Sequence, residues 1–362
     1  MRRPVRVAFI ALLNVLVLTA AGKVLPGILQ LPAPDGTHVV GTKTVVLGDV
    51  SRHRDLLVTL WYPSHSESGI APYMDRKTGA AIAEDWKLPS NFADRVHTNA
   101  NLEAPIEKGA FPLVLLEHGS GVVPAIYTVL VEGLASHGFI VAATNHPPDS
   151  LIAVFPDGHE LRSKPYWPVD ADRRTQGIAI GKFADEVLVP DVRFLLDKLE
   201  KMNMSDEFWR GHIDMAKVGI MGHSMGGTTA ALATKEERRI SAGINLDGST
   251  FPGMNNDIRP IELGKPLLFI ATEEHASDPE ARAREYSGSK SNTYYVVVPG
   301  SDHLSFTDKR LIQTQFGETD MPYARALLIV ETTRTLAEQF FGKYLKGDSA
   351  PILDLPVSVV QQ

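Results

Sequence analysis

The chain has 362 residues and no cysteine, and its 36 Lys and Arg against 43 Asp and Glu give a formal net charge of −7. A chain without cysteine has no disulfides, no cysteine catalysis, no iron–sulfur cluster and no thiolate zinc site. A mildly acidic chain without a basic block is also a poor candidate for nucleic-acid binding, where clustered Lys and Arg supply most of the affinity.

The first 21 residues have the layout of a signal peptide. An apolar run from Val7 to Ala21 follows Arg2, Arg3 and Arg6. A basic region, an apolar stretch of about 7–15 residues and then small residues are typical of export, whereas a membrane span needs about 20 apolar residues. We therefore predict that residues 1–21 are a signal peptide of an exported, periplasmic or secreted protein. An uncleaved N-terminal membrane anchor and a cytoplasmic protein remain alternatives.

Short apolar runs alternate with helical patterns along the chain. The predicted strands are Val39–Leu47, Leu56–Tyr62, Leu113–Glu117, Phe139–Thr144, Val218–Met221, Ala242–Leu246, Leu267–Ala271 and Tyr294–Val298. The predicted helices are Ile126–His137, a stripe from Val192 to Met202, Gly226–Thr234 and Ala324–Tyr344. Nearly continuous apolar runs are typical of strands buried on both faces of a parallel sheet. The alternation predicts a mostly parallel, doubly wound α/β sheet with helices on both faces.

No linker divides the chain, so we expect residues 22–362 to form a single domain. Two long connections, near residues 64–111 and 145–182, are rich in Pro, Asp and Gly. Connections of this length usually carry function or cover a site. The second connection contains three aromatic residues: Phe155, Tyr166 and Trp167. They either form a wall of a substrate pocket or pack the connection itself.

A glycine-rich turn joins the strand Val218–Met221 to the next helix. Its sequence, Gly222-His223-Ser224-Met225-Gly226-Gly227, is a G-x-S-x-G motif between strand and helix, the context of a nucleophile elbow. The turn lifts the Ser224 hydroxyl out of the sheet and directs the Met225 N–H toward a developing oxyanion at a helix N-terminus. We therefore predict an α/β-hydrolase with Ser224 as nucleophile. The alternative is a purely structural turn, and His223 is expected to be structural.

A serine nucleophile needs a positioned base, and these sheets present the partners in the order serine, acid, histidine. The histidines that follow Ser224 in the sequence are His275 and His303. His303 comes directly after the last apolar strand, where a loop can overhang the strand ends, whereas His275 lies in a polar stretch and is expected to be solvated. We therefore predict His303 as the base.

The acid that orients His303 has several candidates. Asp247 ends the strand Ala242–Leu246, beside the elbow strand, and a carboxylate there can reach the imidazole. Glu273 and Glu274 end the following strand, the commoner position of the acid in this fold class. Asp302 adjoins the histidine, but neighbours in sequence rarely direct both side chains at each other. We favour Asp247 and keep the other three as alternatives.

The second oxyanion donor is expected in the loop after an early strand. The segment Leu116-Glu117-His118-Gly119-Ser120-Gly121 follows such a strand, and its glycines let backbone N–H groups face a ligand. We predict the backbone N–H groups of Ser120 and Met225 as the oxyanion hole. His118 is expected to hold the loop in place.

The sequence resembles the plasma-type platelet-activating-factor acetylhydrolases, and especially their exported bacterial relatives, over most of residues 31–345. The resemblance rests on the following segments: Leu31-Pro32-Ala33-Pro34, Val40-Gly41-Thr42, Trp61-Tyr62-Pro63, His118–Gly121, Leu134–Ala143, Gly222–Gly227, Asn245–Gly248 and Phe306-Thr307-Asp308. It implies Ser224 as nucleophile, Asp247 as acid, His303 as base, and the amides of Ser120 and Met225 as the oxyanion hole.

The oxyanion loop departs from that family in two places. Better-known members have serine before the loop histidine and leucine after its glycine, where this chain has Glu117 and Ser120. These departures concern the choice of substrate more than the hydrolytic chemistry.

The function predicted is a serine carboxylic-ester hydrolase that forms an acyl-enzyme, with short-acyl esters or platelet-activating-factor-like phospholipids as substrates. Such a mechanism needs no metal and no organic cofactor, and the sequence has neither a metal-ligand histidine spacing nor a phosphate-binding loop. An uncleaved leader would hold the enzyme at a membrane. The alternatives are an acyltransferase or peptidase with the same triad, and a non-catalytic binding protein of the same fold.

Overall fold

The computed structural model describes residues 16–18, 24–66, 68–249, 264–277, 293–349, 352 and 358–361. The predicted leader lies outside these residues except for Leu16–Leu18, strand β1, which pairs with β2 (Val24–Pro26) in a separate small sheet. Within the described ranges, none of the helices has both the length and the apolar character that crossing a membrane requires.

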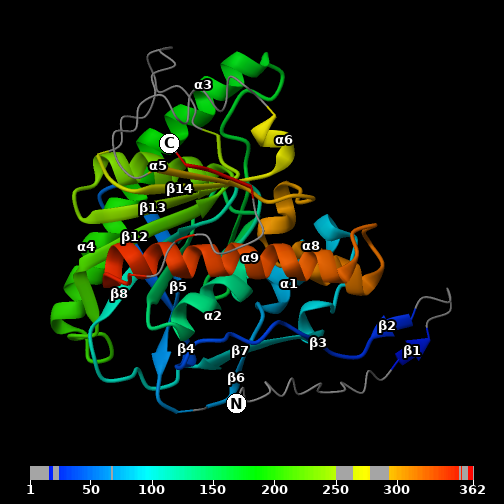
Figure 1. The fold of residues 1–362 in the computed structure, drawn as a ribbon, viewed down its shortest axis with the longest axis horizontal. Coiled ribbons are helices and arrows are strands. Elements are labelled where there is room, and N and C mark those ends of the chain that lie inside the picture. Colours follow the sequence, from blue (N-terminus) through cyan, green and yellow to red (C-terminus); the bar gives the residue numbers. More distant parts are fainter. Residues whose placement is uncertain are drawn as a thin grey trace, which may run out of the picture.

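Twelve strands of the described chain form one sheet (Figure 1). Its order is β16 (Ser358–Gln361), β15 (Thr293–Val297), β14 (Leu267–Ala271), β13 (Ile240–Leu246), β12 (Ile213–His223), β8 (Phe111–Glu117), β9 (Ile140–Asn145), β5 (Arg54–Ser64), β4 (Val39–Asp49), β7 (Val96–Leu102) and β3 (Leu29–Gln30), with β6 (Ile70–Pro72) paired to β7. Neighbouring strands run parallel from β15 to β9, whereas β16, β5 and β4 introduce antiparallel pairs. All eight predicted strands are therefore confirmed.

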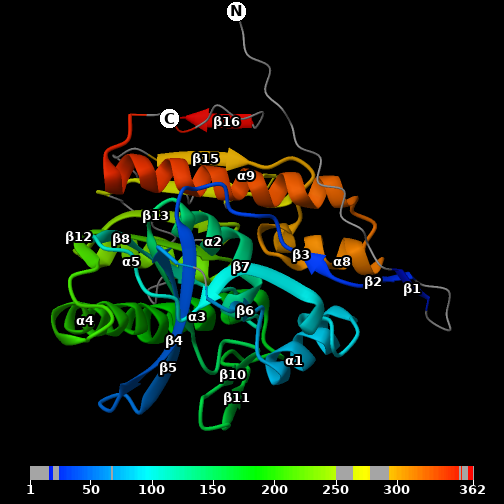
Figure 2. The same ribbon diagram turned by 90° about the horizontal axis from the view of Figure 1, so that it is seen from below.

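Helices cover both faces of this sheet. They are α1 (Arg76–Trp86), α2 (Thr128–Ser136), α3 (Arg173–Phe183), α4 (Val189–Ser205), α5 (Met225–Glu236), α6 (Glu273–Ala276), α8 (Lys309–Phe316) and α9 (Tyr323–Phe341). Figure 2 shows α9 and α4 on opposite sides of the sheet. The four predicted helices correspond to α2, α4, α5 and α9, and the predicted mostly parallel α/β sheet with helices on both faces is confirmed.

The two largest apolar clusters among the described residues, one on each face of the sheet, explain the apolar runs. Successive side chains of a strand point to opposite faces. In β8, Val114 and Leu116 enter the core beneath α2 and α9, whereas Leu113 and Leu115 enter the core beneath α4 and α5. All four are fully buried, so every position of the strand interior has to be apolar.

The two long connections contain structure that the sequence analysis did not resolve. The connection near residues 64–111 forms β6, α1 and β7, and α1 begins where the Asp75 carboxylate accepts hydrogen bonds from the N–H groups of Lys77 and Thr78. The connection near residues 145–182 forms a hairpin of β10 (Ile152–Val154) and β11 (Glu160–Arg162) and nearly all of α3.

Candidate active site

Ser224 occupies a strained turn between β12 and α5. Its backbone has φ 55° and ψ −117°, a left-handed conformation that costs a residue other than glycine about 1–3 kcal/mol. The turn is tight, because a Cβ added at Gly222 would overlap the carbonyl oxygen of Gly226. The Ser224 N–H donates to the carbonyl of Leu246 at 2.9 Å, which ties the turn to the end of β13. The local geometry is that of the strand–elbow–helix unit expected from the motif.

His303 and Asp247 meet beside this turn. His303 Nδ1 lies 2.7 Å from Asp247 Oδ2, and the other carboxylate oxygen accepts from the N–H and hydroxyl of Thr272 at 2.9 and 3.1 Å. The His303 side chain is 49% exposed, whereas the Asp247 side chain is 4% exposed. The imidazole is therefore reachable from solvent while its carboxylate partner is enclosed.

The hydrogen bonds around Asp247 keep it ionised. Burial by itself would raise the pKa of this carboxyl, but the hydrogen bonds from His303 and from the Thr272 N–H outweigh burial and hold the pKa below its usual value. An ionised carboxylate only accepts hydrogen bonds, so His303 carries its proton on Nδ1. The Nε2 atom is then free to accept a proton.

The structure places Asp247 at His303 and keeps the other candidate acids away. Glu273 and Glu274 are exposed at the start of α6. The Asp302 carboxylate caps the short helix that His303 begins (His303–Phe306), where it accepts from the N–H of the residue after His303. Among the described residues, Asp247 is the carboxylate that contacts the His303 ring.

The expectation that His275 is a solvated loop residue is wrong. Its side chain is 13% exposed, and its Nδ1 lies 3.5 Å from Asp247 Oδ1. The physical reason is local: Thr272 caps α6 and accepts from the His275 N–H at 3.1 Å, which turns the histidine back toward Asp247. Two histidines thus flank one carboxylate, and only His303 is both exposed and at hydrogen-bond distance.

The oxyanion loop, His118–Gly121, lies against the elbow. A Cβ added at Gly119 would sit 3.3 Å from the Ser224 Cβ. The N–H groups of Gly119 and Gly121 donate to Tyr127 Oη at 3.1 Å and to a backbone carbonyl at 2.8 Å. Within the described part of the chain, the N–H groups of Ser120 and Met225 have no acceptor. Both predicted donors therefore lie on segments that adjoin Ser224.

A chain of neutral hydrogen bonds joins the loop to His303. Tyr127 Oη lies 2.9 Å from His223 Nδ1, and His223 Nε2 lies 2.7 Å from the carbonyl oxygen of His303. A carbonyl only accepts, so His223 carries its proton on Nε2 and accepts from the tyrosine hydroxyl. Burial, followed by the charge of His303, lowers the pKa of His223 to about 3, which keeps the ring neutral. Sequence reasoning missed Tyr127, for which no local pattern gives a signal.

His118 has the loop-holding position expected of it. Its Nδ1 donates to the carbonyl of Gly119 at 2.7 Å, and its Nε2 accepts from the His146 N–H at 3.2 Å. Burial lowers the pKa of His118, in keeping with this neutral form. The ring is fixed at both nitrogens beneath the loop.

The three aromatic residues of the second long connection fall into two places. The Tyr166 hydroxyl lies 3.4 Å from Ser120 Oγ, and Trp167 packs edge-on against Tyr166 at 4.6 Å between ring centroids. Phe155 is buried elsewhere and lines a cavity of about 390 Å³ together with Trp61 and Tyr73. Tyr166 therefore adjoins the oxyanion loop, whereas Phe155 belongs to a separate cavity.

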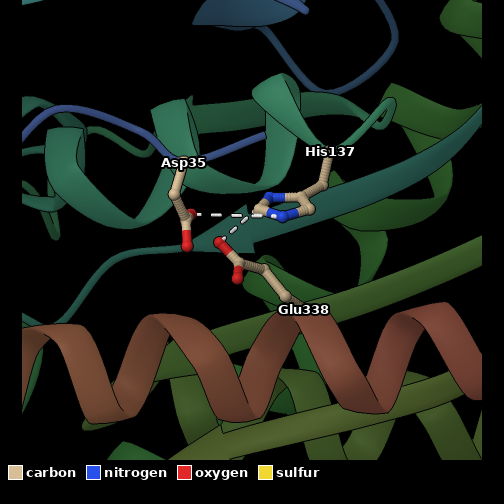
Figure 3. A group of neighbouring side chains, drawn as sticks. All are labelled: Asp35, His137 and Glu338. Atoms are coloured by element: carbon tan, nitrogen blue, oxygen red, sulfur yellow. Dashed lines mark ion pairs between the residues drawn. The ribbon is translucent and has the colours of Figure 1, made fainter. Parts of the chain in front are cut away.

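A cluster of possible metal ligands lies at the end of α2. It consists of Asp35, His137 and Glu338 (Figure 3). The guanidinium of Arg334 lies 3.3 Å from Asp35 Oδ1 and 3.6 Å from Glu338 Oε1 and neutralises both carboxylates. His137 Nδ1 lies 3.3 Å from Glu338. A fixed cation between the acids opposes binding of a metal ion, so we assign the cluster to ion pairing that ties the N-terminal segment to α2 and α9.

Comparison with known proteins gives consistent matches. The family described as "Platelet-activating factor acetylhydrolase, isoform II" matches residues 27–164 and 192–318, more than half of the chain. The platelet-activating factor acetylhydrolase of Canis lupus familiaris is 28% identical over 309 residues, covering 77% of this chain and 68% of the relative. A probable 1-alkyl-2-acetylglycerophosphocholine esterase of Arthroderma benhamiae is 24% identical over 95% of both chains. Among solved structures, a ferulic acid esterase from Streptomyces cinnamoneus has a TM-score of 0.77 and 29% identity, covering 92% of this chain and 99% of that one.

Proposed function

Since the chain belongs to the family described as platelet-activating factor acetylhydrolase, isoform II, we propose that it is a serine hydrolase whose catalytic triad is Ser224, Asp247 and His303. The protein has the α/β-hydrolase fold and is a carboxylic-ester hydrolase, and the resemblance noted in its sequence is confirmed. One observation carries the proposed triad: the 2.7 Å hydrogen bond from His303 to Asp247, formed beside the strained turn at Ser224.

In the proposed acylation step, His303 Nε2 takes the proton of Ser224 Oγ as that oxygen attacks the ester carbonyl carbon. The carbonyl oxygen becomes an oxyanion, which accepts hydrogen bonds from the N–H groups of Ser120 and Met225. Loss of one such donor typically costs about 10²–10³ in rate. The bond to the leaving oxygen then breaks, the proton passes from His303 to that oxygen, and a neutral alcohol departs.

Water completes the cycle in the proposed deacylation step. It attacks the acyl carbonyl while His303 takes one of its protons, and the same two amides bind the second oxyanion. Collapse breaks the bond to Ser224 Oγ, which recovers its proton from His303 and releases a carboxylic acid. Overall, one ester and one water are converted to one alcohol and one carboxylic acid, so the proposed reaction requires no cofactor.

The proposed substrates are esters with short acyl groups, either simple soluble esters or platelet-activating-factor-like phospholipids. Two named relatives support this choice, since one is a platelet-activating factor acetylhydrolase and another a probable 1-alkyl-2-acetylglycerophosphocholine esterase. The Tyr166 hydroxyl lies 3.4 Å from Ser120 Oγ, and we propose that this aromatic ring borders the acyl group of the substrate.

Hydrolysis of p-nitrophenyl esters from acetate to palmitate tests the proposal. We expect the wild type to prefer the shortest chains and Ser224→Ala to lose about 10⁴-fold or more in kcat. Ser163→Ala is the matched control, because Ser163 is exposed in the second long connection and its activity should equal that of the wild type. Retained activity in Ser224→Ala would refute the mechanism, and a preference for palmitate would refute the short-acyl assignment.

Product analysis separates the remaining alternatives. A 1-alkyl-2-acetyl phospholipid tests the lipid substrate, and methyl ferulate tests the activity named for the Streptomyces structure. Adding an alcohol, an amine or a peptide distinguishes hydrolysis from acyl transfer and from peptide cleavage. We expect free acetate as the main product in every mixture that contains an acetyl ester.

We also propose that residues 1–21 are an export leader and that residues 22–362 form one catalytic domain. The basic and apolar layout of the leader supports the first part, and the single sheet order supports the second. Expression of the whole chain in a bacterial host tests both. The exported protein should begin at Gly22, and unfolding should show one cooperative transition, whereas an intact Met1 would contradict cleavage.

A further inference from the structure

A buried group of charged side chains lies directly behind the oxyanion loop. Glu117 is the last residue of β8 and His146 follows β9, and Glu117 Oε2 lies 2.5 Å from His146 Nε2. The other ring nitrogen of His146 lies 2.9 Å from Oδ2 of Asp191, in the first turn of α4. None of the three side chains is more than 2% exposed. The imidazole thus bridges two carboxylates in the interior.

Two arginines contact Asp191 from outside: Arg52 in the turn between β4 and β5, and Arg54 at the start of β5, with side chains 27% and 19% exposed. Arg52 Nη1 lies 2.7 Å from Asp191 Oδ1, and Arg54 Nη2 lies 2.6 Å from Asp191 Oδ2. Both nitrogens of His146 face carboxylate oxygens, so both donate and the ring is an imidazolium. Burial lowers the pKa of His146, but the two carboxylates outweigh burial and raise it to about 10. We call these residues the buried charge network: Glu117, His146, Asp191, Arg52 and Arg54.

His146 also holds the oxyanion loop on both sides of its serine. Its backbone N–H donates to His118 Nε2, and His118 Nδ1 donates to the Gly119 carbonyl. The backbone carbonyl of His146 accepts from the Asp149 N–H at 2.7 Å, and the Asp149 carbonyl accepts from the Gly121 N–H at 2.8 Å. The positions before and after the serine are thereby tied to one residue, whose side chain is fixed by buried charges.

Stability alone does not account for such a network. Taking charges out of water is costly, and buried ion pairs are often no more stabilising than apolar residues of the same volume. The second carboxylate oxygen of Glu117, Oε1, has no hydrogen-bond partner among the described residues, so its desolvation is not compensated. The charges instead fix the orientation of the His146 ring, because an imidazolium held at both nitrogens cannot rotate without breaking two charged contacts.

We propose that Glu117 and Asp191, acting through His146, position the oxyanion loop so that the Ser120 N–H points at the oxyanion. The inference rests on the proposed function, because it concerns an amide assigned there to the oxyanion hole. Glu117, Asp191 and His146 are positioning residues that touch neither the substrate nor the reacting atoms. A displacement of about 1 Å can cost about 10²-fold in rate, so losing the contact should lower kcat and leave KM nearly unchanged.

The test compares Glu117→Gln with Glu132→Gln. Both change a buried glutamate to its amide, but the Glu132 carboxylate on α2 accepts from the backbone N–H groups of Asn99 and Ala100, away from the oxyanion loop. The measurements are kcat and KM for p-nitrophenyl acetate and inhibition by a boronic acid that forms a tetrahedral serine adduct. In Glu117→Gln we expect kcat to fall about 10- to 100-fold, boronate affinity to fall in parallel and KM to change less than about threefold. In Glu132→Gln we expect all three to match the wild type.

A kcat of folded Glu117→Gln within about twofold of the wild type would overturn the inference, and so would an equal loss in Glu132→Gln. If circular dichroism shows that Glu117→Gln does not fold, Glu117→Asp takes its place, since it keeps the charge but is too short to keep the 2.5 Å contact. Its kcat should then fall, and a wild-type kcat would contradict the inference. Ser224→Ala separates the two proposals: activity in Ser224→Ala refutes the proposed function, whereas an inactive Ser224→Ala with an unimpaired Glu117→Gln refutes only the positioning role.

Discussion

Replacing Asp247 by asparagine probes the triad sharply, because the surrounding donors decide which way the new amide turns. One carboxylate oxygen accepts from the Thr272 N–H at 2.9 Å and the other from His303 Nδ1 at 2.7 Å. Asparagine has a single oxygen, and the backbone N–H of Thr272, which cannot rotate away, requires it. The NH2 group then faces His303 Nδ1, so the ring proton moves to Nε2. That nitrogen can no longer take the proton of Ser224.

The size of the loss can be worked from these contacts. Turning the amide the other way would set its NH2 group against the Thr272 N–H, which then loses its acceptor, and one unsatisfied buried donor costs about 1–3 kcal/mol. The productive orientation is therefore disfavoured by about 5- to 150-fold. The variant also lacks the negative charge that stabilises the His303 imidazolium in the transition state. Together we expect kcat of Asp247→Asn to fall about 10⁴-fold, or about 5.5 kcal/mol, with KM nearly unchanged.

The assay is hydrolysis of p-nitrophenyl acetate at neutral pH, with Glu273→Gln as the matched control. Glu273 begins α6 directly after the neighbouring strand β14, but it is exposed and its carboxylate accepts from the Gly300 N–H at 3.1 Å. The activity of Glu273→Gln should therefore stay within about twofold of the wild type. A kcat above about one tenth of the wild type in folded Asp247→Asn would refute the reasoning. A comparable loss in Glu273→Gln would refute the choice of acid.

Three other outcomes are expected. In the same assay His303→Gln should lose about 10⁴-fold or more in kcat, whereas His275→Gln should lose less than about tenfold, because only His303 is exposed and at hydrogen-bond distance from the acid; equal losses would contradict this division. In Gly226→Ala the new Cβ would overlap the backbone carbonyl of Glu117, so the free energy of unfolding in urea should fall by about 3 kcal/mol or more, and a wild-type value would show that the elbow has room. The pKa of His146 is raised to about 10 in the folded protein, so its contribution to stability is complete below the unfolded value of about 6.5 and is lost as the pH rises toward about 10. Urea unfolding should show this decline, on the order of a few kcal/mol, and His146→Asn should show a smaller one; identical slopes would argue against a buried imidazolium.

The central sheet could be predicted because the apolar runs of its strands indicate burial on both faces of the sheet. In β8, alternate residues from Leu113 to Leu116 enter opposite cores, so this part of the strand is an unbroken apolar run. The elbow could be predicted for a similar reason. A Cβ at Gly222 would overlap the backbone of Gly226, and a Cβ at Gly226 would overlap the backbone of Glu117. The turn therefore requires both glycines, so the motif itself indicates the geometry.

The edge of the sheet was harder to predict. Strand β7 has the sequence Val-His-Thr-Asn-Ala-Asn-Leu. It pairs with β4, β3 and β6, and of its residues Val96 and Ala100 enter the apolar core. Helix α1 has Gly79 in its second turn, which lowers the helical tendency of an isolated segment. Both elements depend on contacts with segments that are distant in the sequence, and local sequence patterns do not reveal such contacts.

The acid and the positioning residues illustrate the same limit at the active site. Three candidate acids follow the carboxyl ends of buried strands: Asp247, Glu273 and Glu274. The sequence favours Asp247, but this position alone does not separate the three. The choice depends on the backbone, since Asp247 has φ 50° and its carboxylate turns toward His303. The contact of Glu117 with its histidine joins residues 29 apart, and each of them alone resembles an ordinary polar residue at a strand end.

The oxyanion loop is held by charged residues on one side and by neutral residues on the other, and this arrangement favours protonation of His303. The buried charge network lies behind the loop, whereas the side that faces the nucleophile is held by Tyr127 and His223, both neutral. The ring of His223 lies 4.6 Å from that of His303, which becomes an imidazolium during each proposed acylation. A second cation at that distance would oppose the protonation of His303. Because burial and the charge of His303 lower the pKa of His223 to about 3, His223 stays neutral through the cycle and keeps donating to the His303 carbonyl. On the side that faces Ser224, the loop is therefore held by the neutral side chains of Tyr127 and His223. His303 is then the group there that becomes positively charged during the proposed reaction.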